Sequence, residues 1–318
     1  MDPLTEQELN DLVFLAQRAL WQDKEVKRRL QANGVNLTPA NFYSNLPLVE
    51  DIERSFEYAE EAAGAAPYDT GLFDRETILA FTRSIGEYAR EFDPPIDGDA
   101  ADPQGFFWNN PAFSGSDAMA YYCVLRMLRP RRVLEIGCGF STLVADMALR
   151  ANGGGELVCI EPYPMPFLHR IESVARVIEK PVQSIPVDEL VGMVEASQVF
   201  FIDSTHTVKV GSDCLYLYLK VMPRIRTEVL CHSHDIFLPY ALPEKWGLEM
   251  NIFWTEQYLL LAYLLDNPRA RILFGSNYLR RGEPEACTAF MQGRDRLRGA
   301  SLWYRLNGAA DGAASATR

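Results

Sequence analysis

The sequence predicts an α/β fold with a seven-stranded, mostly parallel sheet covered by helices and preceded by a helical segment. From about residue 117 onward, short apolar runs rich in β-branched residues alternate with helical runs. Strands buried on both faces of a parallel sheet have this continuous apolar character, because crossover helices cover both faces. The first hundred residues show only helical spacing. We therefore expect three parts: a helical segment at 1–105, an α/β core at 106–307 and a disordered tail at 308–318.

The N-terminal segment begins with an amphipathic helix. Apolar residues recur at helical spacing between Leu9 and Leu20, and Thr5 with Glu8 forms the pattern of a capping box. Two further helical stretches are expected around 48–63 and 75–92, before a connector rich in Pro, Gly and Asp. The pattern indicates a lid or appendage, without a catalytic site of its own.

The core follows in regular order after a helix that Pro130 ends. Each of the first five strands is expected to lead into a helix, with right-handed crossovers between parallel neighbours. The last two strands are separated by a stretch with little helical character. The expected strands are 131–137, 155–162, 180–186, 197–204, 227–235, 270–279 and 300–307.

Composition excludes several classes of function. The formal net charge of −12 argues against a nucleic-acid partner, since phosphate binding needs a basic face. No apolar run is long enough to span a membrane, and the acidic N-terminus lacks the layout of a signal peptide. The six cysteines form no C-x-x-C pair and are expected to be reduced and buried. We expect a soluble, cytoplasmic protein.

A glycine-containing turn, VLEIGCGFST, lies between the first core strand and its helix. Gly137 and Gly139 would let the backbone turn tightly and approach a ligand at the carboxyl edge of the sheet. The third glycine of a dinucleotide fingerprint is replaced by Thr142, so NAD or FAD fits poorly. Glu161 ends the second strand about 20 residues later, where a carboxylate can accept ribose hydroxyls or cap the next helix.

These motifs resemble class I methyltransferases, which use S-adenosylmethionine (SAM) and have a Rossmann-like sheet. The segments NFYSNLP, IDSTH, SHDIFLP and FWTEQYLL further resemble a bacterial subfamily of small-molecule methyltransferases. The resemblance covers nearly the whole chain. It implies that Glu161 takes the ribose of SAM and that Gln183 and Ser184 lie near the adenine. The residues that it implies for the methionine part are Glu135, Gly137, Gly139 and Ser141.

A second cluster of polar residues follows the fourth and fifth strands. His206, His232 and His234 flank Asp203 and Asp235, which end these strands. Parallel strands bring their carboxyl ends to one edge, so Asp203 should meet the His234–Asp235 pair beside the methyl group of the cofactor. Strand alternation should point His232 and His234 to the same face.

Three interpretations of this cluster remain open. Asp203, His234 and Asp235 could bind a divalent ion that orients an acceptor hydroxyl, as in the metal-dependent catechol and sugar O-methyltransferases that the arrangement resembles. His234 in place of an oxygen ligand leaves Mg, Mn, Fe and Zn all open. Alternatively, His206 or His234 acts as a metal-free general base oriented by Asp203 or Asp235. The third interpretation is purely structural, with these groups capping helices and loops.

Aromatic residues in the N-terminal part suggest a cover over the site. Tyr43 would make an edge contact with the sulfonium, while Asn109 and Asn110 would supply hydrogen bonds. The same aromatics could instead only attach the helical segment to the sheet, and an apolar lid would allow a homodimer. Phe253 and Trp254 are further candidates for the pocket. The remaining aromatic candidates are Phe42, Phe107, Trp108 and Phe113.

Three functions remain in competition. The first is methyl transfer from SAM to a small-molecule acceptor, most simply at oxygen, in specialised metabolism or on a sugar. The second is another reaction of bound SAM, such as its cyclisation or elimination, and the third is a non-catalytic, SAM-responsive protein.

Overall fold

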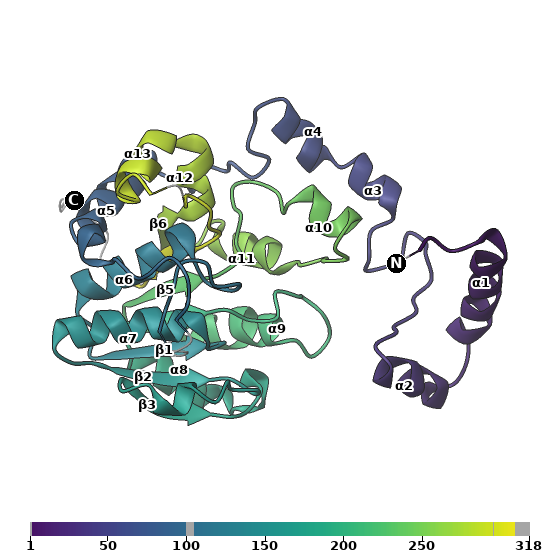
Figure 1. Cartoon of the computed structure of the whole chain (residues 1–318), viewed down its shortest axis with the longest axis horizontal. Helices are drawn as coiled ribbons and strands as arrows, with labels where there is room; N and C mark the ends of the chain where they lie inside the picture. The colour runs from purple at the N-terminus through teal and green to yellow at the C-terminus, as the bar shows by residue number, and fades with distance from the viewer. Residues whose placement is uncertain (1, 100–104, 295, 309–318) are drawn as a thin grey trace, which may run out of the picture.

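The computed structural model describes residues 2–99, 105–294 and 296–308. Its centre is a seven-stranded sheet in the order β3-β2-β1-β4-β5-β7-β6 (Figure 1). Strands β1 to β5 are parallel, while β7 is antiparallel to both of its neighbours, β5 and β6. The predicted seven-stranded, mostly parallel sheet is therefore confirmed. Its strands are β1 Arg132–Ile136, β2 Glu156–Ile160, β3 Val174–Ile178, β4 Val199–Ile202, β5 Val229–Ser233, β6 Ala270–Gly275 and β7 Leu302–Leu306.

Helices cover both faces of the sheet. On one face, Tyr121 of α6 stacks on Phe201 of β4 at 4.7 Å, and α6 packs beside α7. On the other face, the hydroxyl of Tyr218, in a π-helical turn after α9, lies 2.9 Å from the hydroxyl of Ser233. The helices of the core are α5 Arg75–Gly86, α6 Gly115–Leu128, α7 Phe140–Asn152, α8 Val187–Glu195, α9 Asp213–Tyr216, α10 Glu244–Leu248, α11 Glu256–Leu264, α12 Ser276–Gly282 and α13 Pro284–Phe290.

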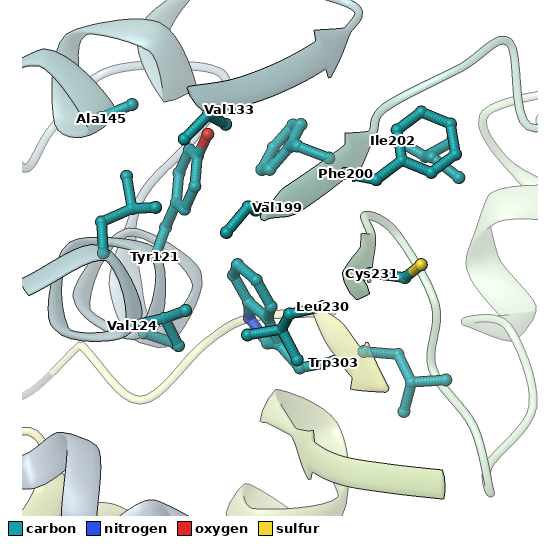
Figure 2. Close-up of a cluster of buried hydrophobic side chains, with 14 of the residues drawn as sticks. Tyr121, Val124, Val133, Ala145, Val199, Phe200, Ile202, Leu230, Cys231 and Trp303 are labelled. Carbon is teal, nitrogen blue, oxygen red and sulfur yellow. The ribbon is translucent and has the colours of Figure 1, made fainter. Parts of the chain in front are cut away.

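The core forms where α6 meets the sheet (Figure 2). Tyr121, Val133, Val199 and Trp303 come from four different elements, and each is fully buried. Burying one large apolar side chain stabilises a fold by about 1.5–3 kcal/mol, so this layer holds the strand ends in fixed positions.

Two expectations about the core were wrong. The third strand is Val174–Ile178, within the expected helix, and not 180–186. Pro181 and Pro186 lack the N–H that a strand needs, and the segment between them forms the 3₁₀ turn Val182–Ser184. The stretch between the last two strands contains two short helices, α12 and α13.

The N-terminal segment is not one unit. Its first helix has the expected capping box between Thr5 and Glu8, but neither α1 nor α2 buries any residue. Both helices stand apart from the sheet at the right of Figure 1. In contrast, α5 buries Ile78 and Ile85 and packs on β6, so it belongs to the core. The remaining helices of the segment are α1 Glu6–Leu20, α2 Lys24–Ala32, α3 Val49–Glu53 and α4 Phe56–Ala62.

Other expectations concern the cysteines, the membrane and the tail. All six cysteines are free, and all but Cys138 are buried. Within the described ranges, no helix is both long and apolar enough to cross a bilayer. Except for Gly308, the predicted disordered tail lies outside the described residues.

Candidate active site

The loop between β1 and α7 reaches the end of β4. Gly137 has a φ of +78°, and a Cβ there would lie 1.9 Å from the main-chain oxygen of Asp203. Only glycine fits such a contact. At Gly139, which precedes α7, a Cβ would meet no atom within 4 Å, so the backbone is open on that side. The loop therefore offers bare backbone to a ligand while it touches the strand that carries Asp203.

Glu135 lies beneath this loop. Its side chain is fully buried, and its carboxylate accepts hydrogen bonds from the hydroxyls of Tyr121 at 2.9 Å and Thr142 at 2.7 Å. The Thr142 hydroxyl in turn accepts the Gly139 N–H at 3.1 Å. Burial raises the pKa of Glu135 to about 7, although the hydrogen bonds from Thr142 and Tyr121 oppose that shift. Glu135 thus supports the loop from below, and Ser141 is buried as well.

Glu161 lies at the end of β2 beside the same loop. Its carboxylate accepts the N–H of Tyr163 at 2.8 Å and that of Cys138 at 3.4 Å. Gln183 and Ser184 are exposed in the turn after β3, the strand next to β2. Apart from Tyr43, the residues expected to bind the methionine, ribose and adenine parts of SAM thus lie in or directly after β1, β2 and β3, which are neighbours at one end of the sheet.

The ends of β4 and β5 bring the predicted histidines and carboxylates together. Nε2 of His206 lies 3.2 Å from a carboxylate oxygen of Asp203 and 3.5 Å from one of Asp235. Nδ1 of His234 lies 3.5 Å from the same two oxygens. As expected, His232 is on the same face of the sheet as His234, with ring centroids 6.0 Å apart. Ser233 points to the opposite face, where its hydroxyl is hydrogen-bonded to that of Tyr218. Two ring nitrogens and two carboxylate oxygens therefore face one another.

Sequence analysis missed two carboxylates behind these histidines. Glu256 begins α11, and its carboxylate lies 2.9 Å from Nδ1 of His206. Asp117, in α6, lies 3.2 Å from Nε2 of His234. Both acids are almost fully buried, at 1% and 4% exposed. The sequence spacing of Glu256 and Asp117 does not indicate that they lie near the ends of β4 and β5. The one feature that could have drawn attention to them is an acidic residue beside a run of apolar residues.

The cluster favours positive charge on its histidines. Burial alone would lower the pKa of His206, but hydrogen bonds to Asp203 and Glu256 raise it to about 10. Burial also opposes charge on His234, yet Asp203, Asp235 and Asp117 raise its pKa well above the usual range. Burial would raise the pKa of Asp203, but His234 and His206 lower it. The carboxylates around these histidines therefore stabilise positive charge at the centre of the cluster.

The backbone is strained at the same place. His206 and Asp235 have φ values of +57° and +54°, in the left-handed region that residues with a Cβ seldom adopt. Such conformations persist where the surroundings enforce them, and they gather at functional sites. Here the N–H groups of Thr255 and Glu256 both donate to the main-chain oxygen of His206, at 2.8 and 3.0 Å.

The aromatic candidates divide into two groups. Trp254 reaches the site, with its ring 4.2 Å from that of His206, and Phe113 lies 5.0 Å from the ring of His234. Trp108 packs in the core against Phe92. Tyr43 is 82% exposed, and the one ring contact described for it is with Phe42, at 4.2 Å.

The aromatic cover was therefore predicted only in part. Tyr43, which was expected to contact the sulfonium, is exposed, and the helices that precede it, α1 and α2, stand apart from the sheet (Figure 1). The side chain of Asn110 stabilises the turn that contains it, because it accepts the N–H of Phe113 at 2.8 Å. The side chain of Asn109 is hydrogen-bonded to Asp97 and Arg296. Neither asparagine reaches the histidine cluster through these bonds.

The sheet order, the antiparallel β7 and the bare loop after β1 define the class of the protein. This is the fold of class I methyltransferases, which are SAM-dependent enzymes. Residues 134–236 match the family model described as "Methyltransferase domain", and the chain is a methyltransferase. It belongs to the same family as an uncharacterized protein of Archaeoglobus fulgidus. The two are 31% identical over 175 residues, which cover 52% of this chain and 76% of the archaeal protein.

Solved structures with a similar fold include two methyltransferases. One is a putative O-methyltransferase from Klebsiella pneumoniae, with 12% identity, a TM-score of 0.34, and coverage of 80% of this chain and 97% of that one. The other is a Podospora anserina methyltransferase bound to SAH, with 18% identity, a TM-score of 0.36, and coverage of 72% and 93%.

Proposed function

We propose that this methyltransferase transfers the methyl group of SAM to a hydroxyl of a small-molecule acceptor, at the edge where β1, β4 and β5 end. The observation that carries the proposal is the contact between Gly137 and the main chain of Asp203. This contact brings the ligand-binding loop directly against the strand end that holds the histidine and carboxylate cluster. A cofactor on the loop would thus lie beside side chains that can orient an acceptor.

The loop fits SAM through specific groups of this chain. Bare backbone at Gly137 and Gly139 would receive the methionine part, with Glu135 and Ser141 supporting the loop from inside. Glu161 would bind the ribose of SAM, and Gln183 and Ser184 would lie near its adenine. When bound, SAM supplies an electrophilic methyl group on a cationic sulfur. Asp203, whose main chain contacts Gly137 of the loop, would face that charge.

The cluster also fits a divalent metal ion. Four separations between its ring nitrogens and carboxylate oxygens lie between 3.2 and 3.5 Å. Ligand bonds of about 2.1 Å place neighbouring donor atoms about 3.0–3.4 Å apart, so these distances suit donors around one cation. Nδ1 of His234 is buried and has no hydrogen-bond partner among the described residues. An unpartnered nitrogen aimed at two carboxylates supports a cation site.

Ligand atoms of Asp203, His206 and Asp235 all lie within 4.8 Å of one another, so we propose His206 as a ligand together with these two carboxylates. His234, with Nδ1 at 3.5 Å from the same two oxygens, would complete the set. Two imidazoles with two carboxylates suit Mn, Fe or Zn better than Mg, which prefers oxygen ligands throughout. A bound ion would lower the pKa of an acceptor hydroxyl. The protein side chains would hold that hydroxyl in line with the methyl group and exclude water, with Trp254 covering His206. In the metal-free alternative, Nε2 of His206 would accept the proton of the acceptor hydroxyl, which requires the imidazole, with its pKa of about 10, to lose its own Nε2 proton first.

Calorimetry of the metal-stripped protein tests the proposal. We expect saturable SAM binding near micromolar Kd, and a separate isotherm for Mn²⁺ or Zn²⁺ that Asp203→Ala abolishes. Asp188→Ala, which removes an exposed carboxylate on α8, is the matched control and should bind both ligands normally. SAM binding without a metal isotherm would select the histidine base. Absence of SAM binding would refute the proposal.

Incubation with SAM and a panel of phenols and sugars should then release SAH with one acceptor class.

We further propose that the protein acts as a homodimer through α1 and α2. Two short helices that bury no residue are not stable in water by themselves, so the apolar surface of α1 and α2 needs a partner. Helix α1 carries three acidic residues and one basic residue, whereas α2 carries four basic residues and one acidic residue. Two copies related by a twofold axis can place α1 of each against α2 of the other with opposite charges facing. The exposed apolar residues of α1 are Leu9, Leu12, Val13, Phe14 and Leu15.

A further inference from the structure

Glu256 holds His206 by both its side chain and its backbone. The acid begins α11, fifty positions after His206, and is 1% exposed. Its carboxylate lies 2.9 Å from Nδ1 of His206, and its N–H donates to the main-chain oxygen of His206 at 3.0 Å. The ring of Trp254 packs on the same imidazole, with centroids 4.2 Å apart. The orientation of the His206 ring is therefore set from α11.

The Glu256 carboxylate is a strong acceptor for a ring N–H. The hydroxyl of Ser204 donates to it at 2.9 Å and that of Tyr218 at 2.5 Å. A buried carboxylate is stable only when its oxygens receive hydrogen bonds, and Nδ1 of His206, 2.9 Å away, is the remaining close group that can donate one. On the other side of the ring, the side chain of Asp203 is 31% exposed and lies at 3.2 Å. Water can donate hydrogen bonds to the partly exposed carboxylate of Asp203 but not to the buried carboxylate of Glu256. The ring proton of His206 therefore belongs on Nδ1, which faces Glu256.

We propose that Glu256 is a positioning residue that keeps a proton on Nδ1 of His206 and directs Nε2 toward Asp203 and Asp235. Nε2 is then the atom that meets a metal ion or an acceptor proton, so the inference rests on the proposed function but holds for either mechanism. Asp117 provides a parallel case, because its carboxylate faces Nε2 of His234 and leaves Nδ1 directed at the cluster. Carboxylates behind metal-binding histidines act in this way, and their loss costs roughly 10–100-fold in metal affinity.

Proton NMR of the ring N–H groups tests this assignment without an acceptor. The chain has four histidines, so the His206 and His234 signals can be assigned with His206→Gln. In the wild type we expect a ring N–H signal of His206 that exchanges slowly with water. Glu256→Leu should remove this signal and leave that of His234, which is the internal control. Glu256→Gln keeps a carbonyl acceptor and should restore the signal. The matched control is Glu57→Leu, since Glu57, like Glu256, accepts two side-chain hydroxyls, here those of Tyr68 and Tyr258, and has no described bond to His206.

Metal affinity is the second readout. We expect Glu256→Leu to weaken Zn²⁺ binding by roughly 10–100-fold, with Glu256→Gln intermediate and Kd for SAM within about threefold of wild type. Tyr218→Phe removes one donor to Glu256 and should have a smaller effect, which keeps the test usable if Glu256→Leu does not fold. A His206 N–H signal that persists in Glu256→Leu would overturn the inference. A wild type that binds neither Zn²⁺ nor SAM would refute the proposed function, while the ring signal would still decide the role of Glu256.

Discussion

At the scale of single residues, Glu135 connects the loop after β1 to the core, and its protonation equilibrium differs from that of an exposed glutamate. It is fully buried between Tyr121 and Thr142, and burial raises its pKa to about 7. The unfolded chain holds the same proton with a pKa near 4.5. The folded state therefore binds the proton more tightly, and its stabilising effect is complete below pH 4.5 and lost as the pH rises through 7.

We expect this proton to be visible in the stability of the protein. Relative to Glu135→Gln, the free energy of unfolding of the wild type should fall by about 3 kcal/mol between pH 4.5 and pH 8. Urea denaturation of both proteins across this range measures the difference. An equal pH dependence in the two proteins would show that Glu135 does not change its protonation on folding.

Gly137 is a position where the main-chain oxygen of Asp203 leaves no room for a side chain. Gly137→Ala would place a Cβ 1.9 Å from the main-chain oxygen of Asp203 at a φ of +78°. The left-handed conformation alone costs about 1–2 kcal/mol, and the clash adds to it. We expect a lower melting temperature and loss of SAM binding by calorimetry. Gly153→Ala, at a φ of +81° where a Cβ meets nothing within 4 Å, should lose stability but retain SAM binding.

At the scale of elements, the amphipathic helices α1 and α5 differ in whether their apolar residues are buried. Both have helical apolar spacing in the sequence, but α5 buries its apolar residues on the core and α1 buries none. The difference arises because α5 packs against β6 and α6, which lie next to it in space. Periodicity predicts that a helix has an apolar face, but it does not identify the surface that this face meets.

The proposed dimer contact lies on α1. Leu9→Glu with Leu12→Glu, which lie one turn apart on the same face of α1, would place charge in an apolar interface, so we expect sedimentation to change from dimer to monomer. The melting temperature of the core should change by less than about 2 °C, since neither side chain contributes to it. As a control, Val210→Glu changes a fully exposed apolar residue outside α1 and α2 and should remain dimeric. A wild type that sediments as a monomer would contradict the proposal.

At the scale of the whole molecule, two strand ends and two distant helices meet at one centre. Asp203 and Asp235 follow β4 and β5, while Glu256 and Asp117 come from α11 and α6. Binding of a metal ion there should stabilise the entire fold, because the unfolded chain does not hold these donors together. At a concentration a thousand times Kd, Zn²⁺ or Mn²⁺ should add about 4 kcal/mol. Thermal melts with and without EDTA measure this, and Asp203→Ala should abolish it.

Local pattern was enough to predict the sheet, the loop after β1 and the meeting of Asp203 with His234. Apolar strand runs and glycines are short-range signals, and parallel strands necessarily bring their carboxyl ends to one edge. The third strand was misplaced, because Val174–Ile178 has apolar spacing compatible with both a strand and a helix. Glu256 and Asp117 could not be found from spacing, since their partners lie 50 and 117 positions away. Which buried acid faces which histidine depends on how helices pack across the sheet, and only the tertiary structure decides that.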